Sequence, residues 1–116
     1  MFRYNLQKPA VYVEGKGFIK FPNAFKPNSS GPNGGGYAND DKNEIFHPDH
    51  YGVTEYKLMI FSRWGEQLFT SKDVLIGWDG YVNGRLAEQG VYMWRAIGTY
   101  TNGKTFDIKG NVTLLR

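Results

Sequence analysis

The chain has 116 residues, which suffices for one small domain with a modest hydrophobic core. Aromatic side chains make up 16% of it and glycine supplies 15 residues, a balance that favours β-strands and excludes both a helical bundle and a disordered chain. The net charge of +3 comes from dispersed basic residues, of which only Lys16 and Lys20 form a loose pair, so nucleic-acid binding is not expected. Cysteine is absent, which excludes disulfides and thiolate metal sites, and no apolar run is long enough to span a bilayer.

The first part of the chain contains two short predicted strands and a loop. Residues 10–13 (Ala-Val-Tyr-Val) form the first strand. Residues 18–21 alternate apolar and basic side chains and form the second, which Pro22 ends because proline cannot donate a hydrogen bond to a sheet. Residues 28–36 contain no apolar side chain and therefore predict an unusually long solvated loop.

The middle of the chain carries the strongest strand pattern. Residues 54–63 alternate, with Leu58 and Ile60 on one face, and apolar residues also occupy the opposite face. Apolar residues on both faces predict a central strand that is covered on both sides. Residues 64–66 then turn the chain back into a strand at 67–70, which predicts an antiparallel hairpin.

The last part of the chain predicts a second hairpin. Residues 71–90 contain several glycines and are predicted to be mostly irregular, whereas residues 91–101 are predicted to form a long strand. Asn102-Gly103 predicts a type I′ turn, and Gly110 is interpreted as a bulge or corner in the returning strand. About seven short strands with frequent turns predict an all-β fold, an immunoglobulin-like antiparallel β-sandwich. The residues predicted to lie in or near its core are Leu58, Ile60, Trp78, Tyr92 and Trp94.

Two clusters contain possible metal ligands, but neither has the spacing of a defined site. Residues 47–50 read His-Pro-Asp-His, where a solvated turn is the favoured interpretation because no third ligand position follows from the spacing. Asp40, Asp41 and Glu44 offer oxygen ligands to calcium without the spacing of an EF-hand loop. We therefore predict no cofactor, and the acidic residues stay as the alternative metal site.

The tryptophans have two interpretations each. Trp78 lies in a tight Gly-Trp-Asp-Gly turn, where it is either an exposed platform for a sugar or, as we favour, a core anchor with Asp79 capping the turn. Trp64 and Trp94 are assigned to the core in the same way. Arg63 can pair with Asp79, stack on an indole ring or remain exposed.

Five segments of the chain, in this order, resemble one family. They are Pro-Asn-Ala-Phe-Lys-Pro-Asn (22–28), Ile-Phe-Ser-Arg-Trp-Gly-Glu (60–66), Gly-Trp-Asp-Gly (77–80), Gly-Val-Tyr (90–92) and Gly-Asn-Val-Thr-Leu-Leu-Arg (110–116). The set resembles the gliding motility-associated C-terminal domain, the type B sorting domain of the Bacteroidetes type IX secretion system. The chain departs from that pattern in an insert beginning at Ser29, where the family has an acidic turn, and in lacking a proline shortly before Gly90.

The resemblance implies a non-catalytic C-terminal sorting domain at residues 22–116, preceded at 1–20 by an upstream strand or linker or by the end of an immunoglobulin-like repeat. Such domains end large surface proteins, often adhesins, which cross the periplasm and reach the cell surface or the medium. The implied partners are type IX translocon proteins at the outer membrane, with neither nucleic acid nor a small-molecule substrate. The sequence contains no nucleophile elbow, phosphate-binding loop or zinc-protease helix, so no enzymatic motif argues against this interpretation. The alternative is a carbohydrate- or surface-binding adhesive module that uses exposed aromatic side chains.

A signal that is read in the folded state needs exposed turns or an available strand edge. The final predicted strand, residues 112–115, has no tail to cover its edge, so we expect that edge to be presented between flanking charges. The turns around Trp64 and Trp78 are further candidates for the surface that a partner recognises. The predicted recognition residues are Arg63, Trp64, Gly65, Trp78, Asp79, Lys109 and Arg116.

Overall fold

The computed structural model describes residues 17–29, 31 and 43–116, in which every regular element is a strand. The strands are β1 (Phe18–Lys20), β2 (Ala24–Phe25), β3 (Asp49–Tyr51), β4 (Val53–Phe61), β5 (Gln67–Ser71), β6 (Tyr81–Val82), β7 (Arg85–Leu86), β8 (Gly90–Tyr100) and β9 (Thr105–Leu114). In these ranges no helix is long and apolar enough to cross a membrane. The predicted strand at 10–13 and most of the predicted loop at 28–36 lie outside the described residues.

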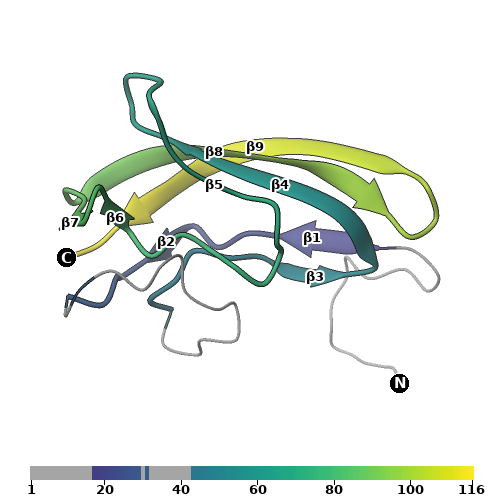
Figure 1. Ribbon diagram of the computed structural model, residues 1–116, viewed down its shortest axis with the longest axis horizontal. Coiled ribbons are helices and arrows are strands. Elements are labelled where there is room, and N and C mark those ends of the chain that lie inside the picture. The colour runs from purple at the N-terminus through teal and green to yellow at the C-terminus, as the bar shows by residue number, and fades with distance from the viewer. Residues whose placement is uncertain (1–16, 30, 32–42) are drawn as a thin grey trace.

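One five-stranded sheet, in the order β2-β9-β8-β4-β5, forms the main layer. Its long strands β4, β8 and β9 are antiparallel and curve together, and β1 and β3 form a two-stranded sheet across from them (Figure 1). This arrangement confirms the predicted all-β sandwich. The described residues contain nine strands rather than about seven, because strands of two or three residues are too short to show an alternating pattern.

Aromatic side chains fill the space between the layers. Phe21 lies 4.3 Å from Trp94 and Phe25 lies 5.6 Å from Trp78, measured between ring centroids. Because side chains alternate along a strand, β4, β8 and β9 each turn one row of apolar residues toward these rings. The predicted core is confirmed: four of the residues are buried and the fifth packs against them, namely Leu58, Ile60, Trp78, Trp94 and Tyr92.

The outer face of the main sheet is less covered than expected. Met59 and Phe61, on the face of β4 opposite to Leu58 and Ile60, are only partly buried. The prediction that this strand is covered on both faces is therefore wrong. Apolar residues on two faces do not by themselves show that both faces are packed, since a folded protein leaves much apolar surface exposed.

Both long hairpins close with the same three-residue loop. In the β4–β5 hairpin, the N–H of Gly65 donates to the carbonyl of Ser62 at 2.9 Å, and Gly65 has a φ of 90°. In the β8–β9 hairpin, the N–H of Gly103 donates to the carbonyl of Tyr100 at 2.9 Å, and Gly103 has a φ of 87°. Asn102 has no positive φ, so the predicted type I′ turn is wrong there. A type I turn followed by a left-handed glycine replaces it.

The segment predicted to be mostly irregular contains its own small hairpin. Strands β6 and β7 pair around Asn83 and Gly84, whose φ angles are 54° and 79°. Two successive positive φ angles are the mark of a type I′ turn, which Asn-Gly favours. The same dipeptide thus gives different turns at 83–84 and at 102–103, because the length and pairing of the flanking strands select the loop.

Gly110 makes room for a tryptophan and does not mark a bulge. It pairs with Trp94 in the unbroken register of β8 and β9. A Cβ atom on residue 110 would lie 2.9–3.1 Å from three atoms of the indole ring, closer than Cβ atoms normally approach other heavy atoms. The predicted bulge or corner is therefore wrong, and the glycine is explained by the close approach of the ring.

The buried hydroxyl of Tyr56 offers a test of the core. Its ring is buried, its hydroxyl has no hydrogen-bond partner among the described residues, and burial raises its pKa well above the usual value. We expect Tyr56→Phe to leave stability unchanged or to raise it by up to about 1 kcal/mol at pH 7, since a buried, unpaired hydroxyl is costly. Urea unfolding measures this, and destabilisation by more than 1 kcal/mol would contradict it.

From the raised pKa of the Tyr56 hydroxyl we can also predict how the stability of the domain changes at high pH. The folded-state pKa is raised, so the contribution of Tyr56 is fully present below its unfolded-state pKa of about 10 and is lost as pH rises beyond it. The free energy of unfolding should therefore fall above pH 10. The Tyr56→Phe variant should show a smaller fall than the parent chain in the same urea titrations.

Candidate functional site

The Gly-Trp-Asp-Gly turn is a structural anchor. The side chain of Trp78 is fully buried, its ring meets that of Tyr92 edge-on at 5.2 Å, and its indole N–H donates to the carbonyl of Tyr81 at 3.2 Å. Asp79 is 4% exposed, and its carboxylate accepts the N–H of Tyr81 at 3.0 Å. The interpretation of Trp78 as a core residue, with Asp79 capping the turn, is confirmed. Burial keeps both side chains from direct contact with a partner of the folded domain.

Trp64 lies at the surface, in contrast to the buried Trp78. The assignment of Trp64 to the core is wrong, because 86% of the residue is exposed at the tip of the β4–β5 hairpin. The turn residues project away from both strands, and the hydroxyl of Ser62 fixes the loop by accepting the N–H groups of Trp64 and Glu66 at 3.2 Å each. The guanidinium of Arg63 lies 5.9 Å from the Trp64 ring centroid, within reach of a cation–π contact. Of the three alternatives for Arg63, two are observed together, because the side chain lies over the indole of Trp64 and remains exposed.

The edge of the final strand is already occupied. Strand β2 runs parallel to the end of β9, where the N–H of Thr113 donates to Asn23 at 2.8 Å and the N–H of Leu115 donates to Phe25 at 2.9 Å. The expectation of a free edge at residues 112–115 is therefore wrong there. The segment that begins Pro-Asn-Ala-Phe folds back onto the C-terminal strand, a pairing of distant residues that no local pattern indicates.

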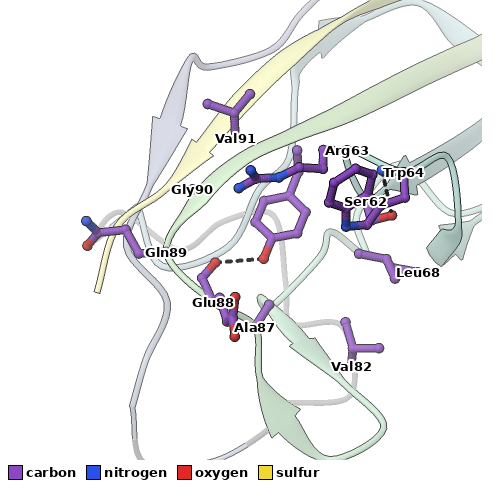
Figure 2. A pocket seen from close by; sticks show the side chains of 11 residues that line it. Ser62, Arg63, Trp64, Leu68, Val82, Ala87, Glu88, Gln89, Gly90 and Val91 are labelled. Atoms are coloured by element: carbon purple, nitrogen blue, oxygen red, sulfur yellow. Dashed lines mark hydrogen bonds between the residues drawn. The ribbon is translucent and has the colours of Figure 1, made fainter.

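Segments far apart in the sequence meet where β9 ends. Gly90 pairs with Leu114, and the backbone N–H of Arg116 donates to the side-chain oxygen of Gln89 at 3.0 Å. The Arg63 guanidinium reaches over the same place, 3.5 Å from where a Cβ on Gly90 would lie (Figure 2). We call this group the C-terminal corner and define it by Arg63, Trp64, Gln89, Gly90 and Arg116.

The pKa of Tyr92 reports the electrostatics of this corner. Burial and the nearby Glu88 carboxylate raise it, whereas the positive charges of Arg63 and Arg116 lower it, and the net effect is a raised pKa. Both arginines therefore lie near the same phenol, although 53 positions separate them in the sequence. The corner therefore brings two guanidinium groups near one phenol.

A cleft of about 260 Å³ opens beside the corner. The rim carries Arg63, Trp64 and Glu88, and the partly exposed apolar walls come from β5, β6, β8 and the segment between β7 and β8. Figure 2 shows these side chains around the opening. The complete lining is Ser62, Arg63, Trp64, Leu68, Val82, Ala87, Glu88, Gln89, Gly90, Val91 and Tyr92.

Comparison with known families explains the pattern of segments. Over residues 19–114 the chain matches the family model of the CHU_C type IX secretion signal domain. The chain belongs to this family. The match confirms the resemblance predicted from the five segments and makes the chain a targeting module for export through the type IX system. No curated protein and no solved structure matches the chain.

The signal domain has an outer surface richer in apolar groups than its sequence suggested. Val91 and Met93 alternate with the inward residues of β8, and Leu115 follows the last inward residue of β9, so all three are exposed, with Val91 in the cleft that Arg63 and Trp64 also line. Sequence reasoning missed these three residues as surface candidates. The alternation that correctly placed Tyr92 and Trp94 inward also places Val91 and Met93 outward, so that signal was available.

Lys109 lies apart from the corner of the signal domain. It is exposed on β9 opposite Arg95, which forms an ion pair with Asp107 at 2.6 Å. Five positions separate Lys109 from Leu114, or roughly 16 Å along a strand. Of the predicted recognition set, the structure therefore places Arg63 and Arg116 near the same tyrosine, with Trp64 and Gly65 in the turn that carries Arg63, whereas Lys109 is remote.

The possible metal ligands do not converge in the described part of the signal domain. Within residues 17–29, 31 and 43–116, no group of three or more histidines or acidic residues is placed to hold a metal ion. His50 lies in β3, pairs with Ile19, and has a pKa lowered chiefly by burial. Asp40 and Asp41 lie outside the described residues, so the calcium site that they would form with Glu44 stays the untested alternative to the prediction of no metal.

Proposed function

We propose that the folded signal domain is recognised by type IX translocon proteins at the outer membrane through its C-terminal corner. The observation that carries this proposal is the convergence of family-like segments beside one exposed tryptophan. Arg63 and Trp64 come from the second segment, Gly90 from the fourth and Arg116 from the fifth. Residues 22–28 and 77–80 support the corner from within, through β2 and through the contact of Trp78 with Tyr92.

The composition of the corner suits a protein partner. Tryptophan, tyrosine and arginine dominate the few residues that carry most of the affinity in protein interfaces. An exposed Trp64 adds nothing to the core, and Val91, which lines the same cleft, extends the apolar surface beside it. Such a cluster on a small domain typically marks an interaction site.

The corner also explains why a signal of this kind is read folded. Its residues lie at positions 63–64, 89–90 and 116, and only the antiparallel pairing of β4, β8 and β9 brings them together. An unfolded chain would present the same residues separately. We infer that the domain folds in the periplasm, is bound there, and carries a large surface protein of a gliding bacterium, such as an adhesin, to the cell surface or the medium.

A fusion experiment tests the proposed function. The 116-residue chain is attached to the C-terminus of a periplasmic reporter in a type IX-competent host and in a mutant that lacks the translocon. We expect the reporter on the surface or in the medium only in the competent host. A reporter that stays in the periplasm of both hosts would contradict the proposal.

One observation favours the alternative of a sugar-binding adhesive module. Trp64 is exposed in the way that a sugar-stacking platform requires, beside the polar side chains of Ser62 and Gln89. A glycan array with the purified chain separates the two functions. Saturable glycan binding that Trp64→Ala abolishes, together with failed export of the fusion, would support the adhesive module.

A further inference from the structure

The cleft beside the C-terminal corner has the features of a site for one side chain of a partner. Its floor and walls are apolar, with Leu68 from β5, Val82 from β6 and Tyr92 from β8. These side chains are only partly buried, so the cleft leaves apolar surface in contact with solvent. Filling it with an apolar group would remove that surface from water, which is the main source of affinity in small pockets.

The walls of the cleft are held in place by hydrogen bonds. The hydroxyl of Tyr92 donates to the carbonyl of Glu88 at 2.6 Å, and the N–H of Ala87 donates to the carbonyl of Gly80 at 2.8 Å. The tight turn at residues 83–84 fixes Val82 in a paired strand. A site formed in advance loses little conformational freedom on binding.

The charge at the rim favours a carboxylate. Arg63 lines the cleft and forms no ion pair among the described residues, where the pair of Arg95 with Asp107 is the one present. Arg116 adds a second guanidinium near the Tyr92 hydroxyl, which its own α-carboxylate offsets in the 116-residue chain, and Glu88 is the one negatively charged side chain of the lining, so Arg63 is the cation that a ligand at the rim would meet. A guanidinium recognises a carboxylate through two parallel hydrogen bonds, which makes Arg63 the group of the rim that would meet one.

We propose that the cleft binds a peptide segment of the partner that carries a large apolar side chain next to an acidic residue. The apolar side chain enters between Leu68, Val82 and Tyr92, and the acidic side chain meets Arg63 at the rim. The inference rests on the proposed function, because it names the chemistry that a receptor of the signal domain would present.

Short peptides and NMR test this site directly. The ¹⁵N-labelled 116-residue chain is titrated with the amidated, acetylated peptides Ser-Phe-Glu-Ser, Ser-Phe-Gln-Ser and Ser-Ala-Glu-Ser. We expect Ser-Phe-Glu-Ser to cause saturable shifts at the amides of residues 87–92, with a dissociation constant of about 1 mM, as is usual for so small a ligand. The glutamine peptide should bind at least about threefold more weakly, and the alanine peptide should cause no saturable shift.

A matched pair of variants assigns the carboxylate to Arg63. Arg63→Gln should reduce binding of the glutamate peptide to the level of the glutamine peptide, whereas Arg85→Gln, at an exposed arginine outside the lining, should change nothing. Both positions are exposed, so both variants should fold, and the NMR spectrum itself verifies this.

Three outcomes would overturn the proposal. They are the absence of saturable shifts at residues 87–92, equal binding of all three peptides, and concentration-dependent broadening that indicates association of the chain with itself. Each of these would leave the fusion experiment unaffected. If the wild-type fusion is exported while the peptides do not bind, the cleft proposal falls and the sorting function stands. If the fusion is not exported, the sorting function itself falls.

Discussion

Trp78→Ala is expected to lower the free energy of unfolding by about 3–5 kcal/mol, the usual cost of truncating a buried tryptophan. The ring is fully buried between Phe25 and Tyr92, and its N–H is bonded to the carbonyl of Tyr81. It also lies where β8 meets the turn that leads into β6. Its loss therefore opens a cavity directly behind the C-terminal corner, and we expect the exported fraction of a fusion to fall as a consequence of unfolding.

Urea unfolding of the purified chain measures this effect, and Trp64→Ala is the matched control. Trp64 is 86% exposed, so its removal should change stability by no more than about 0.5 kcal/mol. Equal destabilisation by the two variants would contradict the assignment of one tryptophan to the core and the other to the surface.

Deletion of residues 114–116 is the second change with a large expected effect. Leu114 is fully buried, pairs with Gly90 on one side and with Phe25 on the other, and its removal alone should cost about 2–5 kcal/mol. The deletion also removes the hydrogen bond from Leu115 to Phe25, which holds the short strand β2. We expect the truncated chain to be largely unfolded at 37 °C, as a thermal melt followed by circular dichroism would show.

The control for this deletion is Arg116→Glu. Arg116 is exposed, and its contact with Gln89 uses the backbone N–H, so the substitution should leave the melting temperature unchanged. A truncated chain that melts like the parent would contradict the role of Leu114 in the core. If the expected unfolding is found, loss of export on truncation reports folding and says nothing about which residues a translocon contacts.

Much of the fold was predictable because strand periodicity is a local signal. The alternation in β4 and β8 placed Leu58, Ile60 and Trp94 in the core, and glycine marked both ends of the Gly-Trp-Asp-Gly turn. The family followed from the order of five short segments, and the match over residues 19–114 confirmed it.

The candidate site was less predictable because it is made of non-local contacts. Pairing of β2 with β9 joins residues 24–25 to 113–114, and no pattern in either segment specifies its partner. Trp64 was misplaced because a tryptophan at a strand end usually packs inward, whereas the three-residue loop turns this one outward. The approach of Arg63 to Gly90 depends on the same loop geometry and could be found only in three dimensions.

Export of matched charge-reversal variants tests the central claim most directly. One variant carries Arg63→Glu, Trp64→Ala and Arg116→Glu at the corner. Its control carries two charge reversals and one apolar truncation at exposed positions elsewhere, namely Lys104→Glu, Lys109→Glu and Leu75→Ala. Each variant is fused to the periplasmic reporter, its melting temperature is verified, and the surface-exposed fraction is measured by protease shaving of intact cells.

The account predicts that both variants melt within a few degrees of the parent chain, because all six side chains are exposed. The corner variant should reach the surface at least about tenfold less, which corresponds to about 1.4 kcal/mol of lost binding, and the control should be exported normally. Equal export of the folded corner variant and its control would contradict recognition at the C-terminal corner. Loss of export in the control alone would instead place the recognised surface at one of the three control positions.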